Sequence, residues 1–153
     1  MRRLSSSLVL IVALSLQSIT WAQPSGKLQI HFMDVGQGDG AILIAPDGET
    51  VLFDNGLLGQ CNKPMAYLQT LGITKIDYQI ISHYHADHLG CTKEVLGKFP
   101  LQHFSLDRGG SYHSNSYDAY LAAVGTKRQT ATEGQIITLA QGRVHRWSSA
   151  SSR

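Results

Sequence analysis

His83-Tyr84-His85-Ala86-Asp87-His88 places three imidazoles and one carboxylate within six positions of the chain. The segment follows directly after residues 76–82, an apolar stretch that predicts a buried strand. Neutral imidazole and carboxylate groups are ligands for a borderline divalent metal such as zinc. The sequence therefore predicts a metal site in a loop at the end of a buried strand, where a rigid scaffold can direct several side chains toward one point.

The spacing within this segment favours two metal ions. His83 and His85 are two positions apart, so in an extended segment their side chains project similarly and can bind one ion. Asp87 and His88 follow where the chain turns into a helix, and they can bind a second ion. Two ions roughly 3.5–4 Å apart can bridge a water and lower its pKa toward neutrality, which suits hydrolysis of an ester, amide, thioester or phosphodiester. The alternative is a histidine-rich surface loop without metal, which the preceding buried strand disfavours.

The pattern of apolar residues predicts a mixed α/β fold. Strands are expected at residues 27–33, 41–45, 50–53, 76–82, 102–106, 127–132 and 135–140. Helices are expected from a cap at Asn62 to Gly72, from about Asp87 to Lys98, and from Ser114 to Val124. The helix that precedes residues 76–82 indicates a β–α–β crossover.

Three motifs resemble those of one enzyme superfamily and occur in the same order. Residues 80–90 (IISHYHADHLG) resemble the signature of the metallo-β-lactamase superfamily, and residues 52–56 (LFDNG) resemble its Asp-x-Gly turn. Residues 33–40 (MDVGQGDG) resemble the opening of one branch, the ComEC-like competence-protein hydrolases. The resemblance covers residues 28–91 and extends more loosely to residue 140. It implies an α/β (α+β) fold, the αββα metallo-β-lactamase sandwich, of which this chain would supply the N-terminal half only.

The resemblance also implies roles for the residues of the histidine motif in a metal-dependent hydrolase. His83 and His85 would bind a first zinc ion, and Asp87 and His88 a second, with manganese or iron as alternatives to zinc. Asp87 would in addition be catalytic, because it would orient the attacking water. The family draws further ligands, a bridging Asp and additional His residues, from a C-terminal half that we do not find in this sequence.

Three aspartates upstream are candidates for supporting this site. The resemblance implies that Asp54 holds the histidine loop through hydrogen bonds, and an ordinary turn is the alternative. Asp34 and Asp39 either support or approach the site, or they belong to a tight glycine turn.

The remaining cysteines and histidines have several possible roles. Cys61 and Cys91 can form a disulfide in an exported protein, and the alternatives are a free thiol or a metal-bound thiolate at Cys91. His103 and His113 are isolated and are expected to be packed or on the surface, although His113 could approach a substrate. His145 is a weak candidate for a later ligand.

The N-terminus has the pattern of a secretory signal peptide. Met1-Arg2-Arg3 is a basic segment, residues 8–16 (LVLIVALSL) are apolar but short for a membrane span, and residues 20–22 (TWA) end in a small residue. We predict cleavage after Ala22 and a periplasmic or secreted protein with no stable membrane span, and an uncleaved anchor is the alternative. Removal of residues 1–22 takes the formal net charge from +2 to zero, which gives no support for a nucleic-acid partner.

The C-terminal residues 141–153 (QGRVHRWSSASSR) show no helix or strand period and are rich in Ser and Arg. We therefore expect a partial domain over residues 23–140, followed by an irregular tail from a truncated or frame-shifted chain. The predicted function is an exported metal-dependent hydrolase acting on a phosphodiester, ester or amide. Nucleic acid is a substrate by the resemblance alone. The alternatives are a β-lactamase proper and a secreted metal-binding domain without catalysis.

Overall fold

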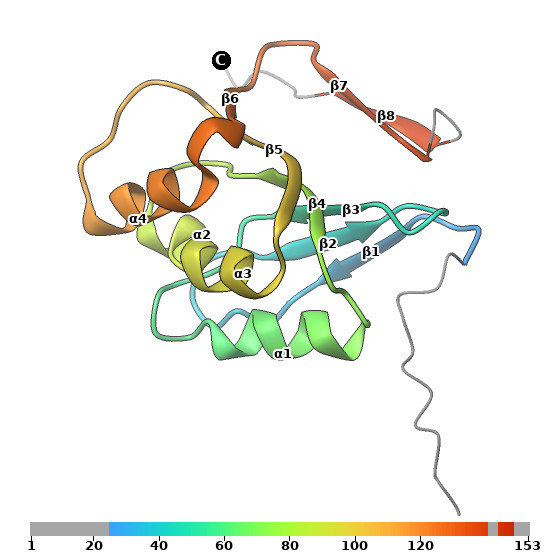
Figure 1. The fold of residues 1–153 in the computed structure, drawn as a ribbon, viewed down its shortest axis with the longest axis horizontal. Helices are drawn as coiled ribbons and strands as arrows, with labels where there is room; N and C mark the ends of the chain where they lie inside the picture. Colours follow the sequence, from blue (N-terminus) through green and yellow to red (C-terminus); the bar gives the residue numbers. More distant parts are fainter. Residues whose placement is uncertain (1–24, 141–143, 149–153) are drawn as a thin grey trace, which may run out of the picture.

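The computed structural model describes residues 25–140 and the backbone of residues 144–148 (Figure 1). Its strands are β1 (Gln29–Phe32), β2 (Ala41–Ile44), β3 (Thr50–Phe53), β4 (Ile76–Ile80), β5 (Leu101–Asp107), β6 (Arg128–Thr130), β7 (Ile136–Leu139) and β8 (Val144–Ser148). Its helices are α1 (Asn62–Thr70), α2 (Ala86–Leu89), α3 (Thr92–Lys98) and α4 (Asn115–Val124), followed by the 3-10 turn η1 (Gly125–Lys127). The predicted mixed α/β fold is confirmed.

Strands β1 to β6 form one six-stranded sheet in chain order. The first three strands pair antiparallel, and β3, β4, β5 and β6 pair parallel. Each parallel connection passes through a helix, as the predicted crossover requires. Because parallel strands run in one direction, the loops after β3, β4 and β5 leave the sheet at the same edge.

Helices α1 to α4 cover one face of this sheet, and the hairpin of β7 and β8 lies over the other (Figure 1). The helix side contains the larger apolar core, in which Leu52, Leu68 and Tyr120 are fully buried. On the opposite side, Ile137 and Leu139 of β7 pack in a smaller cluster with Val51 and Leu106. No helix within residues 25–140 is long and apolar enough to cross a membrane.

Two helix predictions need correction. The single helix expected from Asp87 to Lys98 is two helices, because the chain breaks at Gly90 and Cys91, where the Cys91 N–H donates to the side chain of Asn55. Asn62 is the first residue of α1 and does not cap it, since the N-cap position is Cys61. Ser114 caps α4 as expected, by accepting a hydrogen bond from the Tyr117 N–H.

The C-terminal prediction is wrong for residues 144–148, which form β8 and pair antiparallel with β7. The expected strand 135–140 thus has a partner, and strands β6 and β7 belong to different sheets. His145 lies within β8. The predicted signal peptide of residues 1–22 lies outside the described residues, as do residues 141–143 and 149–153.

Candidate metal centre

The histidine segment lies at the edge where three parallel strands end. Asp54 follows β3, residues 83–88 follow β4, and Asp107 is the last residue of β5. The strand register aligns Phe53 with Ile80, and Ile80 with Leu106, so these three ends are level with one another. The topology therefore brings residues far apart in the sequence to one place.

The three histidines of the segment converge. The ring centroid of His83 lies 4.7 Å from that of His85 and 3.9 Å from that of His88. His85 has extended backbone angles and occupies the N-cap of α2, so that Asp87 and His88 fall in the first turn of this helix. The structure therefore brings together the predicted ligands His83, His85 and His88, with Asp87 beside them.

Asp54 forms hydrogen bonds to this cluster and to the residue that precedes it. Its side chain is fully buried, and it accepts hydrogen bonds from the backbone N–H of Ser82 at 2.9 Å and from the Ser82 hydroxyl at 2.6 Å. Its Oδ2 also lies 2.8 Å from His88 Nδ1. A carboxylate at this distance holds the imidazole proton on Nδ1 and leaves Nε2 free to bind a metal.

Asp54 has a positive φ of 49°, which is uncommon for a residue other than glycine. Aspartate tolerates this conformation better than most residues do. This strained position directly follows β3, and its carboxylate is fully buried. Local strain of this kind is concentrated at functional sites.

The glycine loop before β2 approaches the same place. Gly38 has a φ of +90°, and a Cβ at this position would lie 1.7 Å from the Asp87 carbonyl oxygen, so only glycine fits the contact. Gln37 donates a hydrogen bond to the Asp87 carboxylate at 3.4 Å, and Asp39 places a carboxylate oxygen 3.8 Å from His88 Nδ1. Asp39 therefore belongs to the candidate site.

Asp34 supports the glycine loop instead. It accepts a hydrogen bond from the Gly36 N–H at 2.9 Å and pairs with Lys63 of α1 at 3.3 Å. The Gly36 N–H and Lys63 together hold the pKa of the Asp34 carboxyl below its ordinary value. Its predicted role in the site is thus an indirect one, through the loop that carries Asp39.

Within residues 25–140, Asp39, Asp54 and His88 place one potential ligand atom each within 4.8 Å of one another. Both oxygens of Asp54 are already engaged by Ser82 and His88, so we assign Asp54 to hydrogen-bond support rather than to metal binding. Asp39 is exposed and faces the same imidazole from the solvent side.

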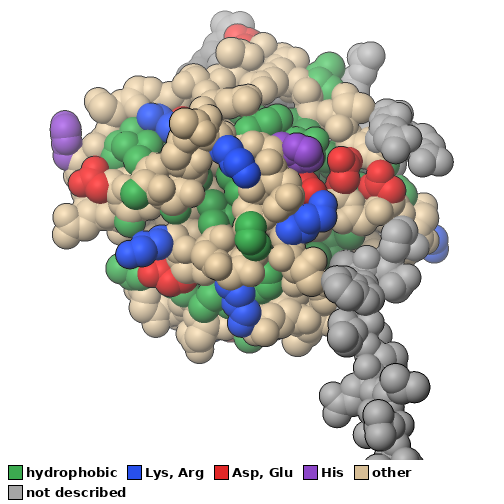
Figure 2. Space-filling model, viewed as in Figure 1, with side chains coloured by type: hydrophobic (Ala, Val, Ile, Leu, Met, Phe, Trp, Pro, Cys, Tyr) green, Lys and Arg blue, Asp and Glu red, His purple; other side chains and the backbone are tan. Residues whose placement is uncertain are grey.

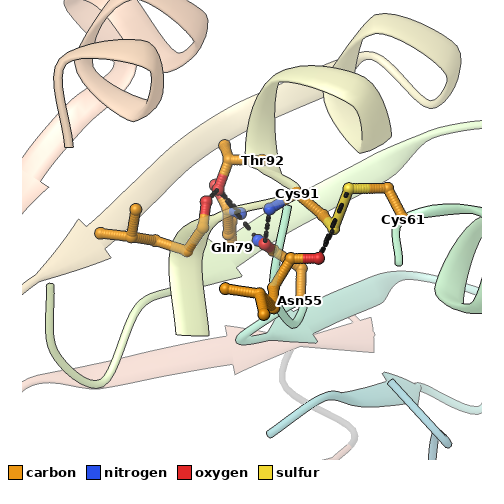
Figure 3. Close-up of a disulfide and its surroundings, with 7 residues drawn as sticks. Asn55, Cys61, Gln79, Cys91 and Thr92 are labelled. Atoms are coloured by element: carbon orange, nitrogen blue, oxygen red, sulfur yellow. Dashed lines mark hydrogen bonds between the residues drawn. A yellow bond between two sulfur atoms is a disulfide. The ribbon is translucent and has the colours of Figure 1, made fainter. Parts of the chain in front are cut away.

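Asn55, the residue after Asp54, connects the turn of residues 52–56 to the start of α3 (Figure 3). Asn55 is fully buried, and its backbone N–H donates to the His88 carbonyl at 2.8 Å. Its side chain accepts from the Cys91 N–H at 3.0 Å and donates to Thr92 Oγ1 at 2.9 Å. Cys61 and Cys91 form a disulfide beside it, so the pairing is confirmed and the free thiol and the metal-bound thiolate are excluded.

The sequence prediction missed the role of Asn55. Its position between Asp54 and Gly56 in the matched turn was the available signal.

His103 and His113 behave as expected. His103 stacks on Tyr78 with ring centroids 4.9 Å apart, and His113 is exposed in the loop before α4.

Comparison with known proteins identifies the architecture. The family model of the metallo-β-lactamase superfamily matches residues 40–142, which is more than half of the chain. The chain belongs to the metallo-β-lactamase superfamily. No match was found among curated proteins.

Solved metallo-β-lactamases share the fold. SMB-1 bound to 2-mercaptoethanesulfonate superposes with a TM-score of 0.53 at 16% identity, over 71% of this chain and 46% of that one. MEM-A1, a subclass B3 enzyme from a soil metagenome library, gives 0.55 at 14% identity, over 72% and 46%. A HARLDQ-motif mutant of the enzyme from Cronobacter sakazakii gives 0.54 at 18% identity, over 78% and 48%. The chain thus spans about half the length of the metallo-β-lactamase structures that it matches.

The donor groups present at this site, imidazole and carboxylate, fit zinc. Burial lowers the pKa of His83, and the neighbouring His88 and His85 lower it further, so its imidazole is neutral near neutral pH. Burial acts to raise the pKa of Asp87, but its own backbone N–H, Gln37 and the adjacent histidines outweigh this effect and bring it below the ordinary value. Neutral imidazole and ionised carboxylate are the forms that bind metal ions.

Proposed function

We propose that this chain carries a zinc site for hydrolysis, formed by His83, His85, Asp87 and His88. One observation supports this most strongly: three imidazoles converge at the end of β4, and one of them is fixed by the buried carboxylate of Asp54. Imidazoles that bind zinc usually donate their other ring N–H to a carboxylate or carbonyl in this way. A surface loop rich in histidine needs no such buried partner.

Each residue has a role in this proposal. His83 and His85 would hold a first ion, and Asp87 and His88 a second. When bound, zinc would supply a nucleophile at neutral pH by acidifying a water. Asp87, kept ionised by its neighbours, would accept a hydrogen bond from the attacking water and orient it toward the substrate. Asp54 keeps the proton of His88 on Nδ1.

We further propose an exported enzyme of the ComEC-like branch that acts on a phosphodiester, ester or amide. The glycine loop of residues 33–40 supports this branch, because Gly38 contacts the Asp87 backbone and Asp39 faces His88. The disulfide and the pattern of residues 1–22 support export, since disulfides persist in oxidising compartments. Among the described residues on the face shown in Figure 2, acidic and basic side chains are interspersed, which favours a small substrate over a long nucleic acid.

The proposal is tested by metal analysis of the purified full-length chain together with phosphodiesterase, esterase and lactamase assays. We expect bound zinc and turnover in at least one assay, and loss of turnover in His83→Ala and Asp87→Ala. Lys98→Ala, which changes the far end of α3, is the matched control and should leave zinc content and turnover unchanged. Turnover that survives both site substitutions would refute the assigned residues.

A second candidate is a metal-binding domain without catalysis. The same convergence of imidazoles supports it, because three imidazoles can bind an ion without catalysing a reaction. Bound zinc that is lost in His83→Ala, without turnover in any of the three assays, would support this candidate over the hydrolase.

A further inference from the structure

Tyr84 lies between the two proposed ligands His83 and His85, yet its side chain is fully buried. Neighbouring side chains of an extended segment point to opposite sides, so the tyrosine ring enters the core while the two imidazoles face the site. The ring packs against Tyr117 of α4 with centroids 4.6 Å apart, and the guanidinium of Arg108 lies 4.4 Å above it. The backbone that carries both imidazoles is therefore attached to the core through one side chain.

The Tyr84 hydroxyl is held on both sides. It donates a hydrogen bond to the Gly109 carbonyl at 2.9 Å and accepts one from Arg128 Nη2 at 2.9 Å. Gly109 belongs to the loop after β5, and Arg128 is the first residue of β6. The hydroxyl thus joins the histidine loop to the two strands beyond it.

Arg128 is in turn fixed by Asp107, which is 1% exposed. Arg128 Nε lies 2.6 Å from Asp107 Oδ2, and Arg128 Nη2 lies 3.2 Å from Asp107 Oδ1. The same carboxylate accepts hydrogen bonds from the Tyr120 hydroxyl at 2.8 Å and the Gly109 N–H at 2.8 Å. Burial acts to raise the pKa of Asp107, but Arg128 and these donors outweigh it and keep the pKa below the ordinary value.

These contacts leave the Asp107 carboxylate fully occupied inside the protein, so it does not serve as a metal ligand. The guanidinium uses its remaining capacity on backbone, because Arg128 Nη2 also donates to the Gly110 carbonyl at 3.1 Å. A planar fork that binds a carboxylate, a hydroxyl and a carbonyl at once is rigid. Among the hydrogen bonds of the described residues, Arg128 contacts the histidine loop only through the Tyr84 hydroxyl.

We propose that Arg128 and Asp107 are positioning residues for the His83–His85 pair, acting through Tyr84. The proposal rests on the metal site proposed above and deepens it. Tyr84 is covalently continuous with both imidazoles, so rotation or displacement of its backbone would move both rings. The anchor restricts this motion before the metal binds. Groups that hydrogen-bond directly to a metal-bound histidine typically change metal affinity by 10–100-fold when they are removed, and residues that act through the backbone are expected at the lower end of this range.

A second ion pair of the same sheet offers a control. Asp77 in β4 is 1% exposed, accepts hydrogen bonds from the Thr50 N–H and hydroxyl and pairs with Lys75. It lies at the opposite end of β4 from the histidines. Asp77→Asn therefore removes a buried carboxylate from the strand that leads to the histidine loop without touching the anchor of Tyr84.

The test compares Tyr84→Phe, Arg128→Lys and Asp77→Asn with the parent in the full-length chain. Zinc affinity is measured by competition with a chromophoric chelator, and the geometry of the site by the visible absorption of bound Co²⁺. We expect Tyr84→Phe to weaken zinc binding by about tenfold and to alter the Co²⁺ spectrum. Arg128→Lys keeps the charge but loses the fork, and it should act in the same direction. Asp77→Asn should lower stability without changing either readout.

A readout in the metal-free protein separates this inference from the proposed function. The imidazole cross-peaks of His83 and His85 in NMR spectra should broaden or shift in Tyr84→Phe and stay unchanged in Asp77→Asn. If the parent binds no zinc, the proposed function fails, and the imidazole spectra still decide whether the anchor positions the rings. If the parent binds zinc and Tyr84→Phe matches it in affinity, Co²⁺ spectrum and imidazole spectra, the inference is overturned while the proposed function stands.

Discussion

The two ends of the histidine motif are held by different kinds of chemistry. At the His88 end, Asp54, Asn55 and the Cys61–Cys91 disulfide form a clamp of short hydrogen bonds and one covalent bond. At the other end, Tyr84 is held by the buried ion pair of Asp107 and Arg128. We call these two regions the disulfide clamp and the ion-pair anchor. The stability of this one loop therefore depends on the redox state of its surroundings at the His88 end and on pH at the Tyr84 end.

The largest effect is expected from breaking the ion-pair anchor. Asp107→Asn removes the charge opposite Arg128 and leaves a partly buried guanidinium unpaired, which costs about 4 kcal/mol in the free energy of unfolding. Urea denaturation followed by circular dichroism measures this loss. A loss below about 1 kcal/mol, the range of an exposed pair, would show that solvent screens the anchor.

The next largest effect is expected from opening the disulfide clamp. The bond joins residues 30 positions apart, so the double variant Cys61→Ser, Cys91→Ser should lose about 3 kcal/mol of stability. The parent treated with a reductant should behave like this variant in urea denaturation. Equal stability of the oxidised and reduced parent would contradict the clamp.

A third experiment tests whether the clamp acts on the metal as well as on the fold. Asp54→Ala removes the partner of His88 Nδ1 and should weaken zinc binding by about 10–100-fold. Asp47→Ala is the matched control, because Asp47 is exposed in the turn between β2 and β3, where it accepts a hydrogen bond from the Glu49 N–H, and its zinc affinity should stay near that of the parent. Chelator competition measures both affinities. Equal losses of zinc affinity in the two variants would contradict a specific role of Asp54 in zinc binding.

The smallest effect concerns acid. The pKa of Asp107 in the folded protein lies below the ordinary value of an aspartate, so its stabilising contribution is complete above that value and is lost as the pH falls through the lower folded pKa. Below about pH 4, the ordinary range of an aspartate, the free energy of unfolding of the parent should decline more steeply than that of Asp107→Asn. Parallel declines would show that other carboxylates dominate the acid response.

Much of the disulfide clamp could be predicted from the sequence because its parts lie in recognisable local motifs. The bounds of β3 agree with the expected strand at residues 50–53, and Asp54 occurs directly after it. The three histidines were predicted as a cluster from their spacing alone. Cys61 and Cys91 were a possible pair, but only the fold decides the distance between two such loops.

The ion-pair anchor could not be predicted in this way. Asp107 and Arg128 are neighbours only because β5 and β6 pair with the register Asp107 to Thr130 and Ser105 to Arg128. No local pattern marks either residue as the partner of Tyr84. The strand β8 was missed for a related reason, since a strand this short is determined by its pairing with β7 more than by its own composition.

The sequence separations of these contacts have a consequence for synthesis of the chain. Every residue of the disulfide clamp precedes Lys93, whereas the Tyr84 hydroxyl bonds to a residue 44 positions further along. A ribosome that adds 5–20 residues per second supplies residues 93–128 in roughly 2–7 seconds. During this interval the residues that bond to His88 are already in the chain, whereas Arg128, which bonds to the Tyr84 hydroxyl, is not. The partners of the two halves of the motif therefore enter the chain at different times.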